Sequence, residues 1–288
     1  MEDLGNMTTR LSARFGPEVS VWCADVPRLV ERTAGRWGLS VGAELEPGAV
    51  SVVLQCRWSN DTPAVLKLSP DRELLAAQAR MLRLFARSGR VPAVLALDGS
   101  ALVLEEVLPG TPAEALPAAA LPGLWADLLD ALHRVPPQPV GLLRGRCEEF
   151  FARIGRRLTE PVIGARISEA AWSRAMRRCE RLLDTETKTV MLHGDLHLGN
   201  ALVGPRGLMA IDPKACVGDP CFDAVDLVVA GAGQEGVAAR CEKVAKACGL
   251  DADRLFGWSQ VIAPLLAVAH LGNGGHDKAV EELLAVSR

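Results

Sequence analysis

The segment that decides the fold reads Val190-Met-Leu-His-Gly-Asp-Leu-His-Leu-Gly-Asn-Ala-Leu-Val203. Its apolar ends flank a polar turn that holds Asp195, His197 and Asn200, and a later apolar run ends on Asp212. This alternation predicts a strand, a loop, a strand, a turn and a strand, with polar side chains at one edge. Two carboxylates and an amide oxygen suit phosphoryl transfer, because that reaction needs an oriented hydroxyl and Mg²⁺ held by oxygen ligands.

The composition narrows the class of protein. With 288 residues, 49% of them hydrophobic, the chain has enough apolar side chains for one large or two smaller domains. Its net charge of -3 and pI near 6.0 argue against nucleic acid as a partner, whereas a mildly acidic protein can attract a cationic small molecule. No apolar run reaches the roughly 18 residues of a membrane span, and residues 1–14 lack the apolar core of a signal peptide. We therefore expect a cytoplasmic protein without a membrane partner, a monomer or a weak dimer.

The eight cysteines are scattered through mostly apolar surroundings and form no CxxC pair. This spacing does not support a zinc site or a thioredoxin-like redox site. We expect buried, reduced thiols.

The first hundred residues predict a mainly antiparallel sheet with one inserted helix, behind a short leading helix. The leading helix is expected from Pro27, with Asp25 near its cap, to about Trp37, and residues 1–6 are interpreted as a frayed end. Two hairpins and one helix capped by Asp71 complete this part: strands at 49–58 and 63–68, the helix at 71–87, and strands at 91–97 and 101–107.

Beyond residue 108 the composition shifts to helix formers. Helices are predicted at 121–134, 146–159, 168–186, 222–231, 235–248, 252–271 and 276–287. The fold class is therefore α+β and bilobal, with an N-terminal lobe at residues 1–107 and a mostly helical C-terminal lobe at residues 108–288 that contains the loop around Asp195.

Lys67 lies inside the apolar strand at residues 64–68, where a charged side chain is costly unless it has a partner. It is either an edge-strand lysine that points to solvent or a phosphate-binding lysine. For the second interpretation we choose Glu73, on the first turn of the next helix, as its acidic partner, with Asp71 as the other nearby candidate.

Two other stretches are candidate nucleotide contacts. Residues 48–51, which end in Ser51, precede a strand where a nucleotide-covering loop would lie, although one glycine makes this an ordinary turn just as well. Glu105, Glu106 and Val107 end the second hairpin, where extended backbone can bind a purine edge or simply form a solvated linker. No GxxxxGK[ST] motif occurs, which argues against a P-loop enzyme.

His193, Asp195 and His197 also have the residue types of a zinc site. On a strand and loop, however, residues i and i+4 do not share a face as they do on a helix. We expect His193 to pack and hold the loop, and His197 to contact phosphate or Asp195. Downstream, Asp219 is expected to cap a turn or helix, and either Asp223 or Asp226 to brace the loop through its backbone.

The loop from His193 to Asn200 resembles the catalytic loop of aminoglycoside phosphotransferases and related small-molecule kinases, which share the protein-kinase-like fold. The segment from Ile211 to Asp223 resembles most closely the branch named for streptomycin 6-kinases and hydroxyurea phosphotransferases. Residues 64–68, 104–105 and 249–258 fit the same branch, and the resemblance spans roughly residues 25 to 275. Two stretches depart from it: the loop near Gly48 has few glycines, and residues 269–276 differ from a streptomycin kinase.

The resemblance implies a role for each candidate residue. Asp195 would be the catalytic base, and Asn200 and Asp212 would bind Mg²⁺. The remaining residues would bind ATP: Lys67 braced by Glu73, Ser51, His197, and Glu105, Glu106 and Val107 at the adenine.

We therefore expect an ATP- and Mg²⁺-dependent kinase that phosphorylates a hydroxyl of an aminoglycoside-type antibiotic such as streptomycin. One alternative keeps the fold and changes the acceptor to hydroxyurea or another small metabolite. Two others, a nucleotide-binding pseudokinase or scaffold and a zinc-dependent hydrolase, belong to different classes of function.

Overall fold

A computed structural model describes residues 4–45, 50–231, 235–272, 274 and 278–287. Compact packing divides the chain into two units, the first formed by residues 1–86 and 91–110 and the second by residues 87–90 and 111–288. The assignment of residues 87–90 to the second unit was not expected from the sequence. The predicted lobe boundary at residues 107/108 stays a prediction.

The first unit is built on a five-stranded antiparallel sheet with the strand order β1-β2-β3-β5-β4. The strands are β1 (Ser40–Glu44), β2 (Val52–Arg57), β3 (Pro63–Leu68), β4 (Val94–Asp98) and β5 (Ala101–Glu105). Both predicted hairpins are present, whereas β1, which is mostly exposed at the sheet edge, was not predicted. In the register of the sheet, Lys67 of β3 pairs with Val53 on one side and Leu102 on the other.

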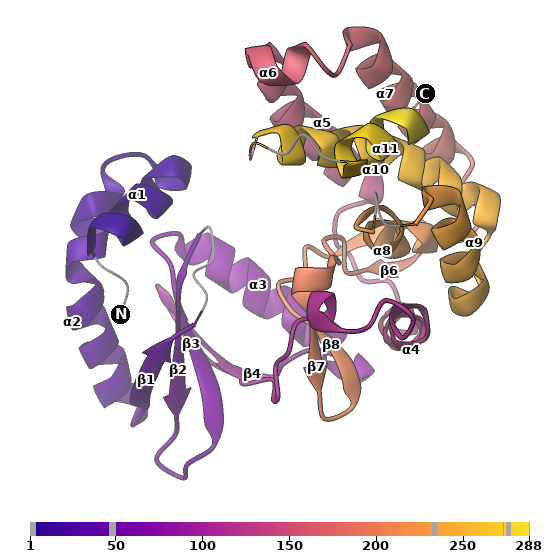
Figure 1. The fold of residues 1–288 in the computed structure, drawn as a ribbon. Coiled ribbons are helices and arrows are strands. Elements are labelled where there is room, and N and C mark those ends of the chain that lie inside the picture. Colours follow the sequence, from indigo (N-terminus) through magenta and orange to yellow (C-terminus); the bar gives the residue numbers. More distant parts are fainter. Residues whose placement is uncertain (1–3, 46–49, 232–234, 273, 275–277, 288) are drawn as a thin grey trace. The chain divides into compact units, whose positions relative to one another are not determined.

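Two helices, α1 (Leu4–Phe15) and α2 (Val19–Trp37), cover one face of this sheet, as Figure 1 shows. Met7 and Leu11 of α1 are buried with alternate side chains of β2 and β3. The prediction that the leading helix starts at Pro27 was wrong, because Pro27 lies inside α2. Burial of Cys23 and Val26 stabilises the helix through this position, although proline lacks the backbone N–H that the helix would use.

Helix α3 (Arg72–Phe85) lies on the other side of the sheet, against β4 and β5 (Figure 1). The predicted cap is confirmed, because a carboxylate oxygen of Asp71 accepts a hydrogen bond of 3.0 Å from the backbone N–H of Leu74. Lys67 alternates with the side chains that pack under α1 and α2, so its side chain leaves the sheet on the face opposite to them. It is nonetheless only 6% exposed.

The second unit contains two short antiparallel ribbons that hold the polar loop. One pairs β6 (Val190–Leu192) with β9 (Cys216–Gly218), and the other pairs β7 (Ala201–Gly204) with β8 (Gly207–Ala210). The predicted order of strand, loop, strand, turn and strand is confirmed. Strand β9 was not predicted, because its three residues are too few to show an alternating pattern.

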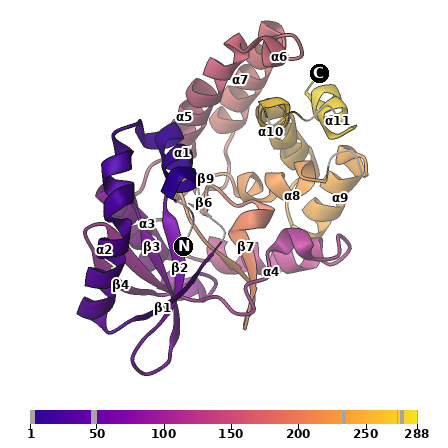
Figure 2. The same cartoon turned by 60° about the vertical axis from the view of Figure 1, so that its left-hand side comes forward.

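The predicted helices of the second unit are present with shifted ends. They are α4 (Leu121–His133), α5 (Leu143–Gly155), α7 (Glu169–Asp184), α8 (Val225–Val229), α9 (Val237–Cys248), α10 (Ala252–Gly272) and α11 (Lys278–Val286), with the short α6 (Pro161–Gly164) in addition. Residues 276 and 277, the predicted start of α11, lie outside the described residues. Figures 1 and 2 show α10 among the other helices, and it packs against α7, α8, α9 and α11.

Helix α10 is long and apolar enough by length and composition to cross a bilayer, but so are many core helices. Within the described residues, 56% of its apolar window is buried inside the protein. This burial and the helices packed around it fit a core helix.

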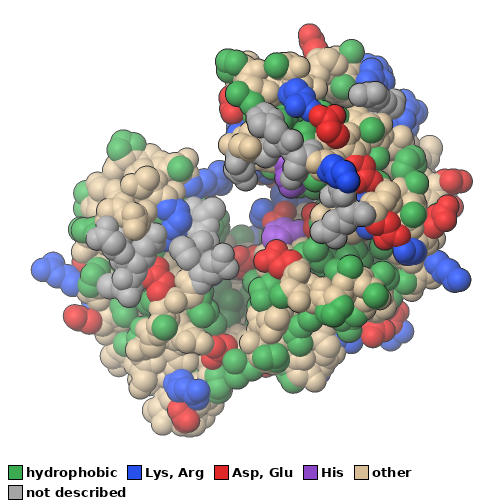
Figure 3. Space-filling view, viewed as in Figure 1, with side chains coloured by type: hydrophobic (Ala, Val, Ile, Leu, Met, Phe, Trp, Pro, Cys, Tyr) green, Lys and Arg blue, Asp and Glu red, His purple; other side chains and the backbone are tan. Residues whose placement is uncertain are grey.

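The eight cysteines are free thiols, as predicted, and all except the half-buried Cys248 are buried. Burial raises the pKa of several of them, including Cys221, so these thiols are protonated. On the surface, acidic and basic side chains are interspersed over the face shown in Figure 3, without an extended basic area there. This arrangement agrees with the small net charge.

Candidate active site

The loop that contains Asp195 connects β6 to a short 3-10 turn at Leu198–Asn200. The side-chain amide of Asn200 donates a hydrogen bond of 2.9 Å to the backbone carbonyl of Asp195. The carbonyl of Asn200 in turn accepts a hydrogen bond of 2.9 Å from the backbone N–H of Ile211, the residue before Asp212. These bonds bring together the backbones that bear Asp195, Asn200 and Asp212, as the sequence predicted.

Asp212 has a φ of 56°, in the left-handed region that residues other than glycine seldom adopt. Such a backbone costs about 1–3 kcal/mol and is found where the surrounding structure requires it, most often at functional sites. The strained position thus coincides with a residue that the sequence predicts to bind metal.

The buried side of the loop is held by Asp223, which is 1% exposed. Its two carboxylate oxygens accept hydrogen bonds from the backbone N–H groups of His193 (2.7 Å) and Gly194 (2.9 Å). The ring of His133 lies 3.2 Å from the same carboxylate. Burial would raise the pKa of Asp223, but the hydrogen bond from His133 and its positive charge hold this pKa below its usual range. Asp223 therefore braces the loop, the role expected for it or Asp226.

Asp219 caps the 3-10 turn at Pro220–Ala224, as predicted, through a hydrogen bond of 2.9 Å from the backbone N–H of Cys221. Its carboxylate also accepts a hydrogen bond of 2.6 Å from the indole N–H of Trp258 in α10. Asp219 thus joins the segment after the active-site loop to the central helix.

Gly194 occupies a position that excludes any side chain. Its φ is 78°, and a Cβ atom there would lie 2.3 Å from the carbonyl oxygen of Lys214. This close approach keeps the backbone of Asp195 next to the segment after Asp212. A glycine is required here for both space and conformation.

His193 is fully buried, and burial lowers the pKa of its imidazole, so the ring is neutral. Its Nε2 donates a hydrogen bond of 3.0 Å to the carbonyl of Ile211. Because Nε2 donates to this carbonyl, that nitrogen is not available to bind zinc. Within the part of the chain that the structure describes, no cluster of three His, Cys, Asp or Glu side chains could hold a metal ion. The geometry supports the packing role of His193 rather than the zinc interpretation.

The open side of the loop presents the carboxylate of Asp195 between two cations. One oxygen lies 3.1 Å from a guanidinium nitrogen of Arg146 in α5, and the other lies 2.8 Å from the amine of Lys214. Arg146 also donates a hydrogen bond of 2.9 Å to the carbonyl of Gly194. Burial would raise the pKa of Asp195, but Lys214 and Arg146 together keep it below its usual range. Sequence analysis did not identify either cation, although Lys214 lies only two residues after Asp212.

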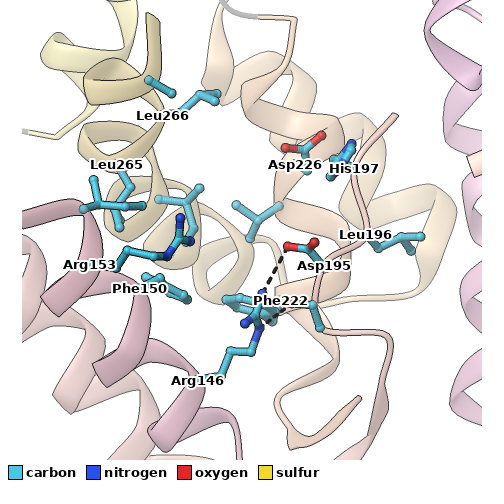
Figure 4. A pocket seen from close by; sticks show the side chains of 15 residues that line it. Arg146, Phe150, Arg153, Asp195, Leu196, His197, Phe222, Asp226, Leu265 and Leu266 are labelled. Atoms are coloured by element: carbon cyan, nitrogen blue, oxygen red, sulfur yellow. Dashed lines mark hydrogen bonds and ion pairs between the residues drawn. The ribbon is translucent and has the colours of Figure 1, made fainter. Parts of the chain in front are cut away.

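Asp195 opens into a cavity of ≈ 380 Å³ within the second unit (Figure 4). Helices α5 and α10 line it with side chains spaced three or four residues apart, and Val225 and Asp226 line it at the start of α8. His197 and Asp226 lie side by side on one wall, as Figure 4 shows. The contact of His197 with phosphate stays a prediction. The cavity is of suitable size for a small-molecule acceptor.

The predicted nucleotide residues lie in the first unit, except His197, which lies in the second unit at the cavity beside Asp195. Lys67 is buried in β3, whereas Glu73 is exposed on the first turn of α3. Gln78, one turn further along α3, is the buried polar side chain of this helix. The pairing of Lys67 with Glu73 stays a prediction, and the exposure of Glu73 does not add support to it.

The other predicted nucleotide residues already have partners in the first unit. Ser51 is 1% exposed and its carbonyl accepts a hydrogen bond from Arg10, while Gly48 lies outside the described residues. The backbone N–H groups of Glu105 and Glu106 donate to the carbonyls of Ala93 and Pro63. Their carboxylates accept hydrogen bonds as well, from the backbone N–H of residue 93 and from the side chain of residue 55. The binding of adenine by this stretch, including Val107, stays a prediction.

The family model for the aminoglycoside/hydroxyurea antibiotic resistance kinases matches residues 36–274 of this sequence. The chain belongs to this family. It is therefore a phosphotransferase that acts on hydroxyl groups, which confirms the class predicted from the loop around Asp195.

Named relatives of this kinase cover most of the chain. It is 31% identical over 259 residues to a streptomycin 6-kinase of Streptomyces griseus, which covers 85% of this chain and 82% of that protein. It is 32% identical over 243 residues to a hydroxyurea phosphotransferase of Kitasatospora aureofaciens, with 81% and 70% covered.

Solved structures confirm the predicted protein-kinase-like fold. A thermostable mutant of aminoglycoside phosphotransferase APH(4)-Ia in its apo form is similar with a TM-score of 0.65, 17% identity, and coverage of 90% of this chain and 98% of that chain. Choline kinase LicA from Streptococcus pneumoniae is similar with a TM-score of 0.65, 14% identity and coverage of 91% and 98%. Another APH(4)-Ia structure, with a TM-score of 0.63, 16% identity and coverage of 90% of this chain and 97% of that chain, is a ternary complex with ADP and hygromycin B.

Proposed function

We propose that this kinase transfers the γ-phosphate of ATP to a hydroxyl group of a small molecule bound in the cavity beside Asp195. The observation that carries the proposal is the position of this carboxylate. It lies at the cavity wall, fixed by Arg146 and Lys214, on a loop whose backbone Asp223 holds from below.

In the proposed reaction, the hydroxyl oxygen of the acceptor attacks the γ-phosphorus and the bond to the bridging oxygen of ADP breaks. The hydroxyl proton passes to the carboxylate of Asp195. Because two cations lower the pKa of Asp195, its carboxylate is ionised at neutral pH and able to accept a hydrogen bond from the hydroxyl. A carboxylate with this low proton affinity orients the hydroxyl first and receives the proton late, as suits a loose transition state.

Asn200 and Asp212 fit a magnesium ion by the chemistry of their side chains. Amide and carboxylate oxygens are hard ligands, and Asn200 uses its amide nitrogen to bind the carbonyl of Asp195, which leaves its oxygen for a cation. When bound there, magnesium would neutralise the charge on the phosphate oxygens of ATP. The protein's part is to hold these two residues in adjacent segments, through the hydrogen bond between residues 200 and 211.

Residues of the first unit are proposed to bind the nucleotide. The buried Lys67 would bind the α- and β-phosphates, with Glu73 as its predicted partner, and the backbone of Val107 would bind adenine. Ser51, Glu105 and Glu106 are further predicted contacts, as is His197 of the second unit. The proposed use of ATP as phosphate donor supports a cytoplasmic location for the reaction.

The names of the relatives put aminoglycosides such as streptomycin first among the acceptors to test, with hydroxyurea as the alternative. The purified chain is incubated with Mg-ATP and each acceptor, ADP release is followed by a coupled assay, and the product mass is measured. Phosphorylation of one acceptor, by a mass increase of one phosphoryl group, supports the proposal. Binding of Mg-ATP in calorimetry without phosphorylation of any acceptor would favour the nucleotide-binding pseudokinase instead, and a failure to bind Mg-ATP would favour a scaffold.

A further inference from the structure

The acceptor pocket has a chemical character of its own, and the inference drawn from it rests on the proposed function. Most of its wall is apolar: Phe150 and Ile154 of α5, Phe222 and Val225 before and in α8, and Ile262, Leu265, Leu266 and Ala269 of α10. Figure 4 shows Leu265 and Phe150 on the side of the cavity that faces Asp195. An acceptor that fills this space therefore has an apolar body.

Two of the four charged side chains of the wall are already paired with each other. Arg146 binds Asp195 and the carbonyl of Gly194, and it lies 3.4 Å from Glu149. Asp195 has Lys214 as a second cation. The single negative charge of Asp195 is thus paired with two positive charges, so it attracts an amine of a ligand only weakly.

The third charged group is Arg153, two turns after Arg146 on the same face of α5. It is exposed, and among the ion pairs of the described residues α5 contributes Arg144 and Arg146 but not Arg153. Figure 4 shows its guanidinium directed into the cavity, across from Asp226 and His197. Within the described residues, this end of the pocket therefore presents a positive charge that is in no ion pair.

The fourth group is Asp226, the single carboxylate of the wall that is not shared between cations. Burial raises its pKa to about 6, against the effects of His197 and of the backbone N–H of Leu198. One such carboxylate can bind one amine or hydroxyl of a ligand. A molecule with several positive charges would need several unpaired carboxylates and would meet Arg153 instead.

We infer that the acceptor is a hydroxyl-bearing amphiphile that is uncharged or carries an anionic group toward Arg153, and that it is not a polycation. Arg153 is then the residue that determines this specificity. The apolar face of α10 binds the body of the acceptor, and the hydroxyl to be phosphorylated lies at Asp195.

A matched series of glycosides tests this inference: phenyl β-D-glucuronide (anionic), phenyl β-D-glucoside (neutral) and phenyl β-D-glucosaminide (cationic), with streptomycin as the polycation. Dissociation constants are measured by calorimetry in the presence of Mg-ADP, and phosphorylation is measured by mass spectrometry. We expect the glucuronide and the glucoside to bind at least about fivefold more tightly than the glucosaminide, and streptomycin to bind most weakly.

The variant Arg153→Glu should reverse the order of the glucuronide and the glucosaminide, with a shift of about fivefold in each dissociation constant. The matched control is Arg156→Glu, an exposed arginine that does not line the cavity, which should leave the order unchanged. Thermal melting of both variants checks that they are folded.

Tight binding or efficient phosphorylation of streptomycin, unaffected by Arg153→Glu, would overturn the inference while the proposed kinase activity stands. Equal binding of the three glycosides, or no binding of any, would also overturn it. Absence of Mg-ATP binding would count against the proposed function itself.

Discussion

The two sides of the active-site loop are built on different principles. On the buried side, the carboxylate of Asp223 accepts hydrogen bonds from two backbone N–H groups and His133, and its own side chain is fully shielded from water. On the open side, the carboxylate of Asp195 has cationic partners and remains 29% exposed. Water does not compete for the buried hydrogen bonds, so they fix the backbone. The ion pairs on the open side can rearrange when a substrate binds. Asp223 thus positions the backbone of the loop from its buried side, and Asp195 is the proposed reacting residue on its open side.

The largest effect is expected from Asp195→Asn, which breaks the open side alone. The amide cannot accept the hydroxyl proton, so kcat should fall by about 10²–10⁴-fold. The affinity for Mg-ATP and the melting temperature should change little, because the buried side is intact. An active Asp195→Asn enzyme would refute the assigned role. Steady-state kinetics and calorimetry with the same protein sample provide the measurements.

Next in size is Asp223→Asn, which breaks the buried side. An amide can accept only through one atom and presents N–H groups to backbone donors, so the free energy of unfolding should fall by about 3 kcal/mol. Activity should fall as well, because the loop is no longer held. The control is Asp184→Asn, which removes an exposed ion pair with Arg144 and should cost less than about 0.5 kcal/mol. Equal urea unfolding curves for the two variants would contradict the distinction between the two sides.

The substitution Gly194→Ala tests the close approach of the loop backbone to Lys214, between the buried and the open side. The new methyl group would collide with the carbonyl of Lys214 in a backbone conformation that alanine disfavours, at a cost of about 2 kcal/mol or more. In Gly123→Ala, the matched control in α4, the methyl group enters open space and should stabilise the helix by about 0.5–1 kcal/mol. Denaturant unfolding of both variants, with kcat for each, separates strain at the loop from a general effect of alanine.

The smallest effect concerns pH and the far wall of the pocket. Folded Asp226 keeps its proton up to a pH of about 6, while the unfolded chain loses it near 4. Between these values the folded state binds more protons, so the contribution of Asp226 to stability falls as pH rises. Asp226→Asn should remove this part of the profile. Unfolding measured from pH 4 to 7 should show the variant gaining stability relative to the native protein as pH increases, and a constant difference would contradict the assignment.

The sequence predicted the parts of this site that depend on local pattern. The strands around the loop and the cap at Asp71 follow from alternation and from the preference of aspartate for helix starts. Arg146 was not found, because 49 residues separate it from Asp195 and nothing in its neighbourhood distinguishes it from other helical arginines. Helix α1 was missed for a similar reason, since its stability comes from packing on the sheet rather than from its own composition.

Helix α10 supplies one wall of the acceptor pocket and is at the same time packed against several other helices. Its Leu265 is only 4% exposed, so a change there alters the shape of the cavity and the packing of the core together. During evolution, a new acceptor gained through α10 would tend to require compensating changes elsewhere. Side chains on the rim, such as Arg153, offer an easier route, and we expect natural diversification of acceptor choice to begin there.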